Sequence, residues 1–143
     1  MKTINKLAPG TLQTRSEFQS QIDSIREVYL LDQPPRFTPE RRQAERFSVT
    51  IPVVIRPLND DMEPMTYTQI GMTRDVSYTG ISVVSSNPQA NRMVRLSVEP
   101  AHLNPIEIVG IVKYCSDFGW YYRLGIEFVF SDTNLPIRQT RSV

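Results

Sequence analysis

The sequence predicts an all-β domain: a small six-stranded antiparallel β-barrel preceded by one amphipathic helix and an extended basic arm. Two observations predict this fold. Six apolar segments of strand length are separated by breaks that contain glycine, proline or asparagine, and no helical interval lies between them. One stretch near the start of the chain has helical periodicity instead. With 143 residues, of which 40% are hydrophobic, the chain is long enough for one domain with one core.

Residues 1–33 are expected to hold a polar tail and one helix, which runs from Arg15 to Leu31. Thr14 and Glu17 have the spacing of a capping box at its start, and Pro34-Pro35 follows its end. Apolar side chains recur along it as on one face of a helix: Phe18, Ile22, Ile25 and Tyr29. This stripe is expected either to pack on the domain or to form a contact for a partner or a second copy.

Residues 34–46 are predicted to form an extended, proline-rich basic arm. They contain three prolines and no regular apolar period. Their arginines are clustered: Arg36, Arg41, Arg42 and Arg46. Because such a segment has no apolar face of its own, we expect it to be mobile in the free protein. It should become ordered when it holds a ligand, with a change in the helix that precedes it.

Residues 47–130 are predicted to form the barrel. From Phe47 to Ile55 apolar residues alternate with polar or smaller ones, and Pro52 indicates an edge strand or a bulge. Further strands are expected at 66–74, 81–85, 93–98, 106–114 and 120–130. Residues 131–143 are polar and interrupted by Pro136, so they are predicted to be a tail without a stable helix.

Composition excludes several classes of function. Sixteen Lys and Arg residues against fifteen Asp and Glu give a net charge of +1, so no overall field favours duplex nucleic acid or an anionic membrane. One cysteine, Cys115, and one histidine, His102, form no disulfide or zinc framework. Cys115 is expected to be an inert core thiol. We expect a cytoplasmic protein without membrane insertion, since no leader and no bilayer-length apolar run is recognised.

No pattern of catalysis is recognised either. His102 has no cysteine or serine motif around it to activate, and no glycine-rich phosphate loop is present. We therefore expect a binding protein and not an enzyme, with no catalytic residue, no metal and no cofactor.

Two short clusters point to a ligand site. Arg42 and Arg46 stand four residues apart in the arm, and a turn of sequence DVSYTG begins at Asp75. A guanidinium is a planar fork of five donors, which suits a phosphate or the O6/N7 edge of guanine. The Asp75 carboxylate accepts only, so it suits the N1 and N2 donors of guanine, and the Ser77 hydroxyl suits a phosphate. Gly80 allows a positive φ or a close approach of the backbone.

The pattern RxxxR followed by DxSxxG resembles the two-part signature of PilZ domains, a family of bacterial cyclic di-GMP receptors. The resemblance covers residues 41 to 130, and Tyr122–Phe128 is similar to the closing strand of the family. It implies a barrel in which RxxxR precedes the first strand and DxSxxG joins the second to the third. Many PilZ domains end in a helix across the barrel. The tail here predicts none, so the helix at residues 15–31 is a candidate for that role.

The resemblance implies a cyclic di-GMP site made by Arg41, Arg42, Arg46, Asp75, Ser77 and Gly80. The extra arginine at position 41 implies two stacked dinucleotides per chain. We therefore expect a receptor that couples the level of this second messenger to a conformational change and to a protein partner, which residues 15–31 would contact. Trp120 and Tyr121 are expected to pack in a strand, outside the site.

Two other functions stay open from the sequence. The chain could be a PilZ-like adaptor that does not bind nucleotide, or a small barrel that binds single-stranded nucleic acid. The intact arginine, aspartate, serine and glycine positions argue against the first. The second would need a basic groove, which the near-neutral composition does not suggest.

Overall fold

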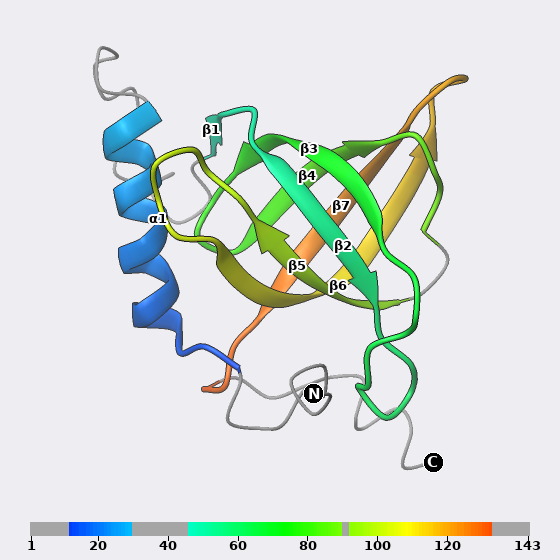
Figure 1. The fold of residues 1–143 in the computed structure, drawn as a ribbon, viewed down its shortest axis with the longest axis horizontal. Helices are drawn as coiled ribbons and strands as arrows, with labels where there is room; N and C mark the ends of the chain where they lie inside the picture. Colours follow the sequence, from blue (N-terminus) through cyan, green and yellow to red (C-terminus); the bar gives the residue numbers. More distant parts are fainter. Residues whose placement is uncertain (1–11, 30–45, 90–91, 133–143) are drawn as a thin grey trace.

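A computed structural model of the chain describes residues 12–29, 46–89 and 92–132. One helix, α1 (Arg15–Tyr29), precedes the strands β1 (Phe47–Ser48), β2 (Pro52–Pro57), β3 (Gln69–Val76), β4 (Gly80–Ser85), β5 (Met93–Val98), β6 (Ile106–Asp117) and β7 (Tyr122–Val129) (Figure 1). Most of the predicted arm, with Arg41 and Arg42, and most of the predicted tail lie outside the described residues. Helix α1 is too short and too polar to cross a bilayer, and the described residues hold no other helix.

The predicted six-stranded antiparallel barrel is confirmed. Neighbouring strands follow the order β3-β2-β5-β6-β7-β4, and β4 pairs with β3 again, which closes the ring. Every pairing is antiparallel. The two-residue strand β1 pairs with β3 outside the ring. Inward-facing side chains of all six strands fill the interior, in agreement with the alternation of apolar residues in the sequence.

Two predicted strands have different boundaries in the structure. The first is divided into β1 and β2, and Pro52 is the first residue of β2, a position that tolerates a residue without an N–H donor. The last begins at Tyr122 and not at Trp120, because residues 118–121 form the turn of a β6–β7 hairpin. In that turn Gly119 has a φ of 101°, and its N–H donates to Asp117 Oδ1 over 2.8 Å.

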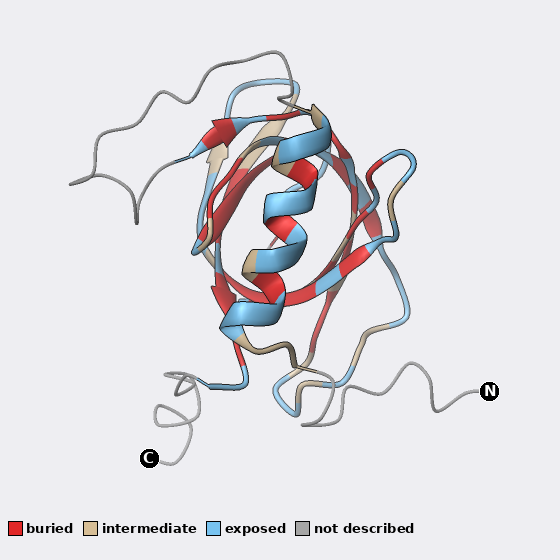
Figure 2. Ribbon diagram, turned by 90° about the vertical axis from the view of Figure 1, so that its left-hand side faces the viewer, coloured by how far each residue is buried: buried red, intermediate tan, exposed pale blue. Residues whose placement is uncertain are grey.

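Helix α1 begins with the predicted capping box. The Thr14 N–H donates to Glu17 Oε1 over 3.0 Å, and the Glu17 N–H donates to Thr14 Oγ1 over 3.2 Å. The helix lies across one end of the barrel (Figure 2), and Phe18, Ile22 and Ile25 are buried in the same cluster as the barrel core. The apolar stripe therefore packs on the domain and closes the barrel end, as one of the two alternatives predicted.

Candidate functional site

The two halves of the predicted site meet beside strand β1. Ser48 pairs with Asp75 of β3, which brings Arg46, just ahead of β1, next to that carboxylate. Arg46 Nη1 lies 2.7 Å from Asp75 Oδ1, although the two residues are 29 positions apart in the sequence. The side chain of Arg46 is 50% exposed and that of Asp75 is 18% exposed. The pair therefore lies at the surface with one open side.

A bulge in β3 turns Asp75 toward this surface. The β3–β4 register shifts between Thr73 and Asp75, so Arg74 is the extra residue. In a regular strand Asp75 would face the same side as Thr73, which is buried and hydrogen-bonded inside the barrel. Because of the bulge, Asp75 instead lies opposite Ser82, on the outside.

Ser77 has a structural role in the turn that joins β3 to β4. It is 2% exposed, and its Oγ accepts hydrogen bonds from the N–H groups of Thr79 and Gly80 over 3.2 and 3.1 Å. This hydroxyl caps the turn in the manner typical of serine. The predicted contact of Ser77 with a phosphate stays a prediction.

Gly80 is required for a close approach, but to the protein itself. It does not adopt a positive φ, so that part of the expectation is wrong. A Cβ at this position would lie 2.8 Å from the carbonyl oxygen of Ile126 in the neighbouring strand β7. A side chain here would therefore separate β4 from β7 directly below the site.

A hollow of about 190 Å³ lies beside the Arg46–Asp75 pair, over strands β4, β6 and β7. The residues that line it are Arg46, Thr79, Gly80, Ile81, Ser82, Lys113, Tyr114, Gly125, Ile126 and Glu127. Its charged groups are two cations and one carboxylate, and Lys113 Nζ lies 3.4 Å from Glu127 Oε1. The hollow thus combines an arginine, a lysine and small polar groups with one aromatic ring.

That ring belongs to Tyr114 and lies against the backbone of Gly125. The two residues are paired between β6 and β7, and a Cβ on Gly125 would lie 2.0 Å from a ring carbon of Tyr114. A second bulge, at Lys113, precedes Tyr114 in β6. Sequence reasoning missed Lys113 and Tyr114, because only the β6–β7 register brings them beside Gly80.

The motif turn is also joined to helix α1. The Tyr78 hydroxyl donates a hydrogen bond to Asp23 Oδ1 of the helix. At the far end of the helix, the Ala101 N–H donates to the Tyr29 hydroxyl over 2.9 Å. The candidate site and the helix that closes the barrel are therefore connected through one side-chain contact.

A second hollow, of about 820 Å³, lies at the start of α1. Its lining is Gln13, Ser16, Glu17, Ser20, Gln21, Pro105 and Glu107. Among the described residues, two carboxylates and no cation line it, so this part of its wall does not suit an anionic ligand. Within the described ranges, no group of His, Cys, Asp and Glu side chains has the arrangement needed to hold a metal ion.

Two expectations about single residues are wrong. Cys115 is exposed and not part of the core, and Trp120 is 88% exposed in the hairpin turn and not packed in a strand. Both lie in the part of the β6–β7 hairpin that follows the Lys113 bulge, where most residues are exposed. Arg46, Asp75 and Gly80 are together at the hollow, with Ser77 in the turn beside them.

Comparison with known proteins identifies the family. A model of the PilZ domain family matches residues 40–140, which is more than half of the chain. A comparison with curated protein sequences gave no significant match.

Three solved structures illustrate what the chain resembles. The inhibitor of motility MotI/DgrA of Bacillus subtilis is 21% identical, with a TM-score of 0.49 over 76% of this chain and 52% of that one. The PilZ domain with c-di-GMP of YcgR from Escherichia coli is 13% identical, with a TM-score of 0.46 over 67% and 82%. The MrkH–c-di-GMP complex of K. pneumonia is 16% identical, with a TM-score of 0.46 over 68% and 47%. The chain thus spans about half the length of the MotI and MrkH chains. Since the family model covers both parts of the signature and the whole barrel, the chain belongs to the PilZ domain family.

Proposed function

We propose that this chain is a receptor for cyclic di-GMP that binds the dinucleotide without changing it chemically. The observation that carries the proposal is the 2.7 Å contact between Arg46 and Asp75 at the edge of the hollow. It joins the two halves of the PilZ signature at one surface. The half-exposed guanidinium would bind a phosphate or the O6/N7 edge of guanine, and Asp75 would accept from the N1 and N2 groups.

The hollow is too small to hold the whole ligand. Sites for drug-sized molecules measure roughly 300 to 1,000 Å³, whereas this hollow measures about 190 Å³. The remaining contacts would come from the arm, through Arg41 and Arg42. Lys113 would add a positive charge near the phosphates, and the Tyr114 ring would offer a face for stacking.

The arm, and not the helix, would respond to the ligand. Moving α1 away from the barrel would expose Phe18, Ile22 and Ile25, at a cost of roughly 1.5 to 3 kcal/mol for each side chain. We therefore propose that α1 stays in place while the arm becomes ordered over the hollow. This replaces the expectation that the helix is repositioned.

The nucleotide-free adaptor is the second candidate. Asp75 is already paired with Arg46, and Ser77 is already hydrogen-bonded within its turn. Both groups are therefore satisfied without a ligand, which favours an adaptor that needs none.

Isothermal titration of the full chain with cyclic di-GMP tests the proposal. Cyclic di-AMP has the same phosphates without the guanine groups, and a thymidine homopolymer tests single-strand binding. We expect binding of cyclic di-GMP alone, at about two molecules per chain if Arg41 supports a stacked pair. If the folded protein gives no binding heat with cyclic di-GMP, the receptor proposal is wrong and the adaptor that binds no nucleotide is the remaining candidate. If the protein binds the homopolymer as well as cyclic di-GMP, it is a nucleic-acid-binding module.

A further inference from the structure

Apolar side chains gather on one outer side of the barrel: Ile70 and Met72 are exposed, and Val54 and Val84 are half-buried. Val54 pairs with Ile70 between β2 and β3, and Met72 pairs with Val84 between β3 and β4. All four side chains point outward, as the alternation with buried residues in each strand shows, and Ile70 is 66% exposed. We name these four residues the outer patch.

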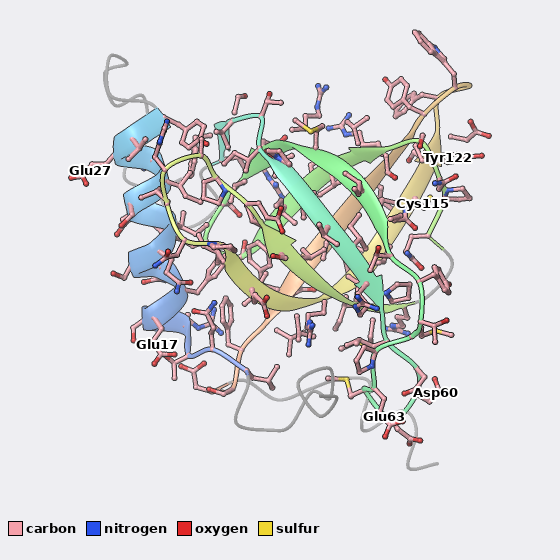
Figure 3. The ribbon with its side chains drawn as sticks, viewed as in Figure 1. Glu17, Glu27, Asp60, Glu63, Cys115 and Tyr122 are labelled. Carbon is pink, nitrogen blue, oxygen red and sulfur yellow. The ribbon has the colours of Figure 1, made fainter. Side chains whose placement is uncertain are left out.

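The β6–β7 hairpin borders the outer patch. Arg123 of β7, near the base of the hairpin, pairs with Val84, so these two side chains share the outer face of the sheet. At the tip the rings of Phe118 and Tyr121 stack with centroids 5.2 Å apart, and the Phe118 N–H donates to the Tyr121 carbonyl over 2.9 Å. Trp120 projects from this closed turn. Figure 3 places Tyr122 and Cys115 of the hairpin on the opposite side of the barrel from Glu17 and Glu27 of α1.

Arginines surround the outer patch. Arg56 and Arg95 lie directly opposite each other on the outer side of β2 and β5, an arrangement of like charges that destabilises a sheet. Arg74 follows Met72 along β3, and Arg123 pairs with Val84. The only acidic residue in β2, β3, β4 and β5 is Asp75, which Arg46 already neutralises. The strands that carry the patch therefore have an excess of arginines over carboxylates, and the acidic residues Asp60, Asp61 and Glu63 lie in the loop between β2 and β3.

We propose that the outer patch, with the aromatic hairpin tip, is a docking surface for a protein partner that presents aliphatic side chains within an acidic surface. The Arg56 guanidinium already donates to the Met65 carbonyl over 2.8 Å, and carboxylates of such a partner would offset the remaining positive charge of Arg56 and Arg95. Aromatic residues and arginines are the side chains that contribute most to protein interfaces. The stripe of α1 is not available for this contact, because the barrel already covers it.

The charge and shape of the surface argue against other occupants. A second copy bound through the same patch would place arginines against arginines. Interfacial membrane binding buries a continuous apolar face, whereas the four patch residues lie within three strands beside arginines, and the hairpin tip offers few apolar groups. A flat protein surface of opposite charge fits both the sheet and the tip.

The docking surface borders the hollow. Arg123 Nε donates to Ser82 Oγ over 3.3 Å, and Ser82 lines the hollow. A dinucleotide in the hollow would therefore lie beside a bound partner. Regulation of docking by the nucleotide rests on the proposed function, whereas docking itself does not.

Site-specific photocrosslinking in the cells of origin tests the proposal. Benzoylphenylalanine replaces Ile70, Trp120 or, as a matched control, Val28, an exposed β-branched residue of α1. We expect positions 70 and 120 to crosslink to one and the same acidic protein, and position 28 not to. Binding of that protein, once purified, should weaken about tenfold or more in Ile70→Thr and in Arg95→Glu, and remain unchanged in Val28→Thr. Thermal unfolding confirms that each variant is folded.

Several results would overturn the proposal. One is that positions 70 and 120 do not crosslink to the same protein. Another is that the protein crosslinked at both positions binds Ile70→Thr as tightly as the parent. Flotation with vesicles of phosphatidylglycerol and phosphatidylethanolamine, abolished in Trp120→Ser, would assign the surface to lipid. A dimer in sedimentation that Ile70→Thr dissociates would assign it to a second copy. Titration of Ile70→Thr with cyclic di-GMP separates the two proposals, because nucleotide binding should be retained whatever happens to docking.

Discussion

Helix α1 and the β6–β7 hairpin both carry aromatic side chains, but they use them in opposite ways. Phe18 of the helix is 1% exposed, and its ring centroid lies 4.6 Å from that of Phe128. Trp120 of the hairpin is almost fully exposed, and the neighbouring rings of Phe118 and Tyr121 stack on each other. The helix completes the core by closing the barrel end, whereas the hairpin projects its rings into solvent. Aromatic content alone therefore does not identify which region is available for binding.

The candidate nucleotide site lies between these two regions and touches both. Tyr78 in the motif turn contacts Asp23 of the helix, and Ser82 contacts Arg123 of the docking surface. A ligand at the hollow would therefore border the helix that packs on the barrel end on one side and an open surface on the other. This position suits a receptor whose output is the exposed face.

The largest expected effect is the loss of stability when the buried Phe18 of α1 is removed. Phe18→Ala should lower the free energy of unfolding by about 3 to 5 kcal/mol, because it leaves a cavity against Phe128 and Phe130. Trp120→Ala should change it by no more than about 0.5 kcal/mol. Urea unfolding measures both. Equal losses in the two variants would show that the hairpin is part of the core and would remove the contrast between the two regions.

Next in size is the effect of Arg46 on the ligand. Arg46→Ala should weaken cyclic di-GMP binding by about 1.4 to 3 kcal/mol, which is roughly 10- to 150-fold, because the fork that reads guanine or phosphate is lost. Arg46→Lys should not restore it, since an ammonium lacks the planar fork.

Arg95→Ala, on the docking surface, is the matched control for titration and should bind like the parent. If it weakens the dinucleotide as much as Arg46→Ala does, the site would extend across the outer patch, and the two surfaces would not be separate.

Gly125 tests the packing that shapes the hollow. Gly125→Ala should cost about 1 to 3 kcal/mol of stability, because its Cβ would overlap the Tyr114 ring. In a Tyr114→Ala background the same change should cost clearly less, since the overlapping atoms are absent. A double-mutant cycle by urea unfolding measures this coupling. Additive losses would show that the ring does not rest on Gly125.

The smallest effect is expected at the contact between the motif turn and α1. Tyr78→Phe removes the hydroxyl that donates to Asp23 and should cost about 0.5 to 1.5 kcal/mol. Tyr121→Phe, in the hairpin tip, is the comparison variant. Amide exchange in α1 should become faster in Tyr78→Phe only. Unchanged exchange would mean that the contact between Tyr78 and Asp23 does not contribute to holding the helix.

Local patterns in the sequence were sufficient for much of the fold. Alternation of apolar residues located the first barrel strand, and breaks with glycine, proline or asparagine separated the other five. The spacing of Thr14 and Glu17 predicted the cap of α1. The signature placed Arg46 and Asp75 in one site before any contact was known. The strands and the helix cap depend on residues that are close in the chain, and the signature is a known combination of motifs. All three can therefore be recognised in one sequence.

Only the tertiary structure decided which surfaces are open and which residues share the hollow. Tyr114, Lys113 and Gly80 meet through the pairing of β4, β6 and β7, and two bulges set which side chains face outward. The exposure of Cys115 and Trp120 depends on how far the hairpin extends beyond the barrel, and alternation of apolar residues does not report this. The sequence allowed the apolar stripe of α1 to pack on the domain or on a partner, and in the structure it packs on the open end of the barrel. Register and burial are properties of pairs of distant segments, so they exist only once the chain has closed into a barrel.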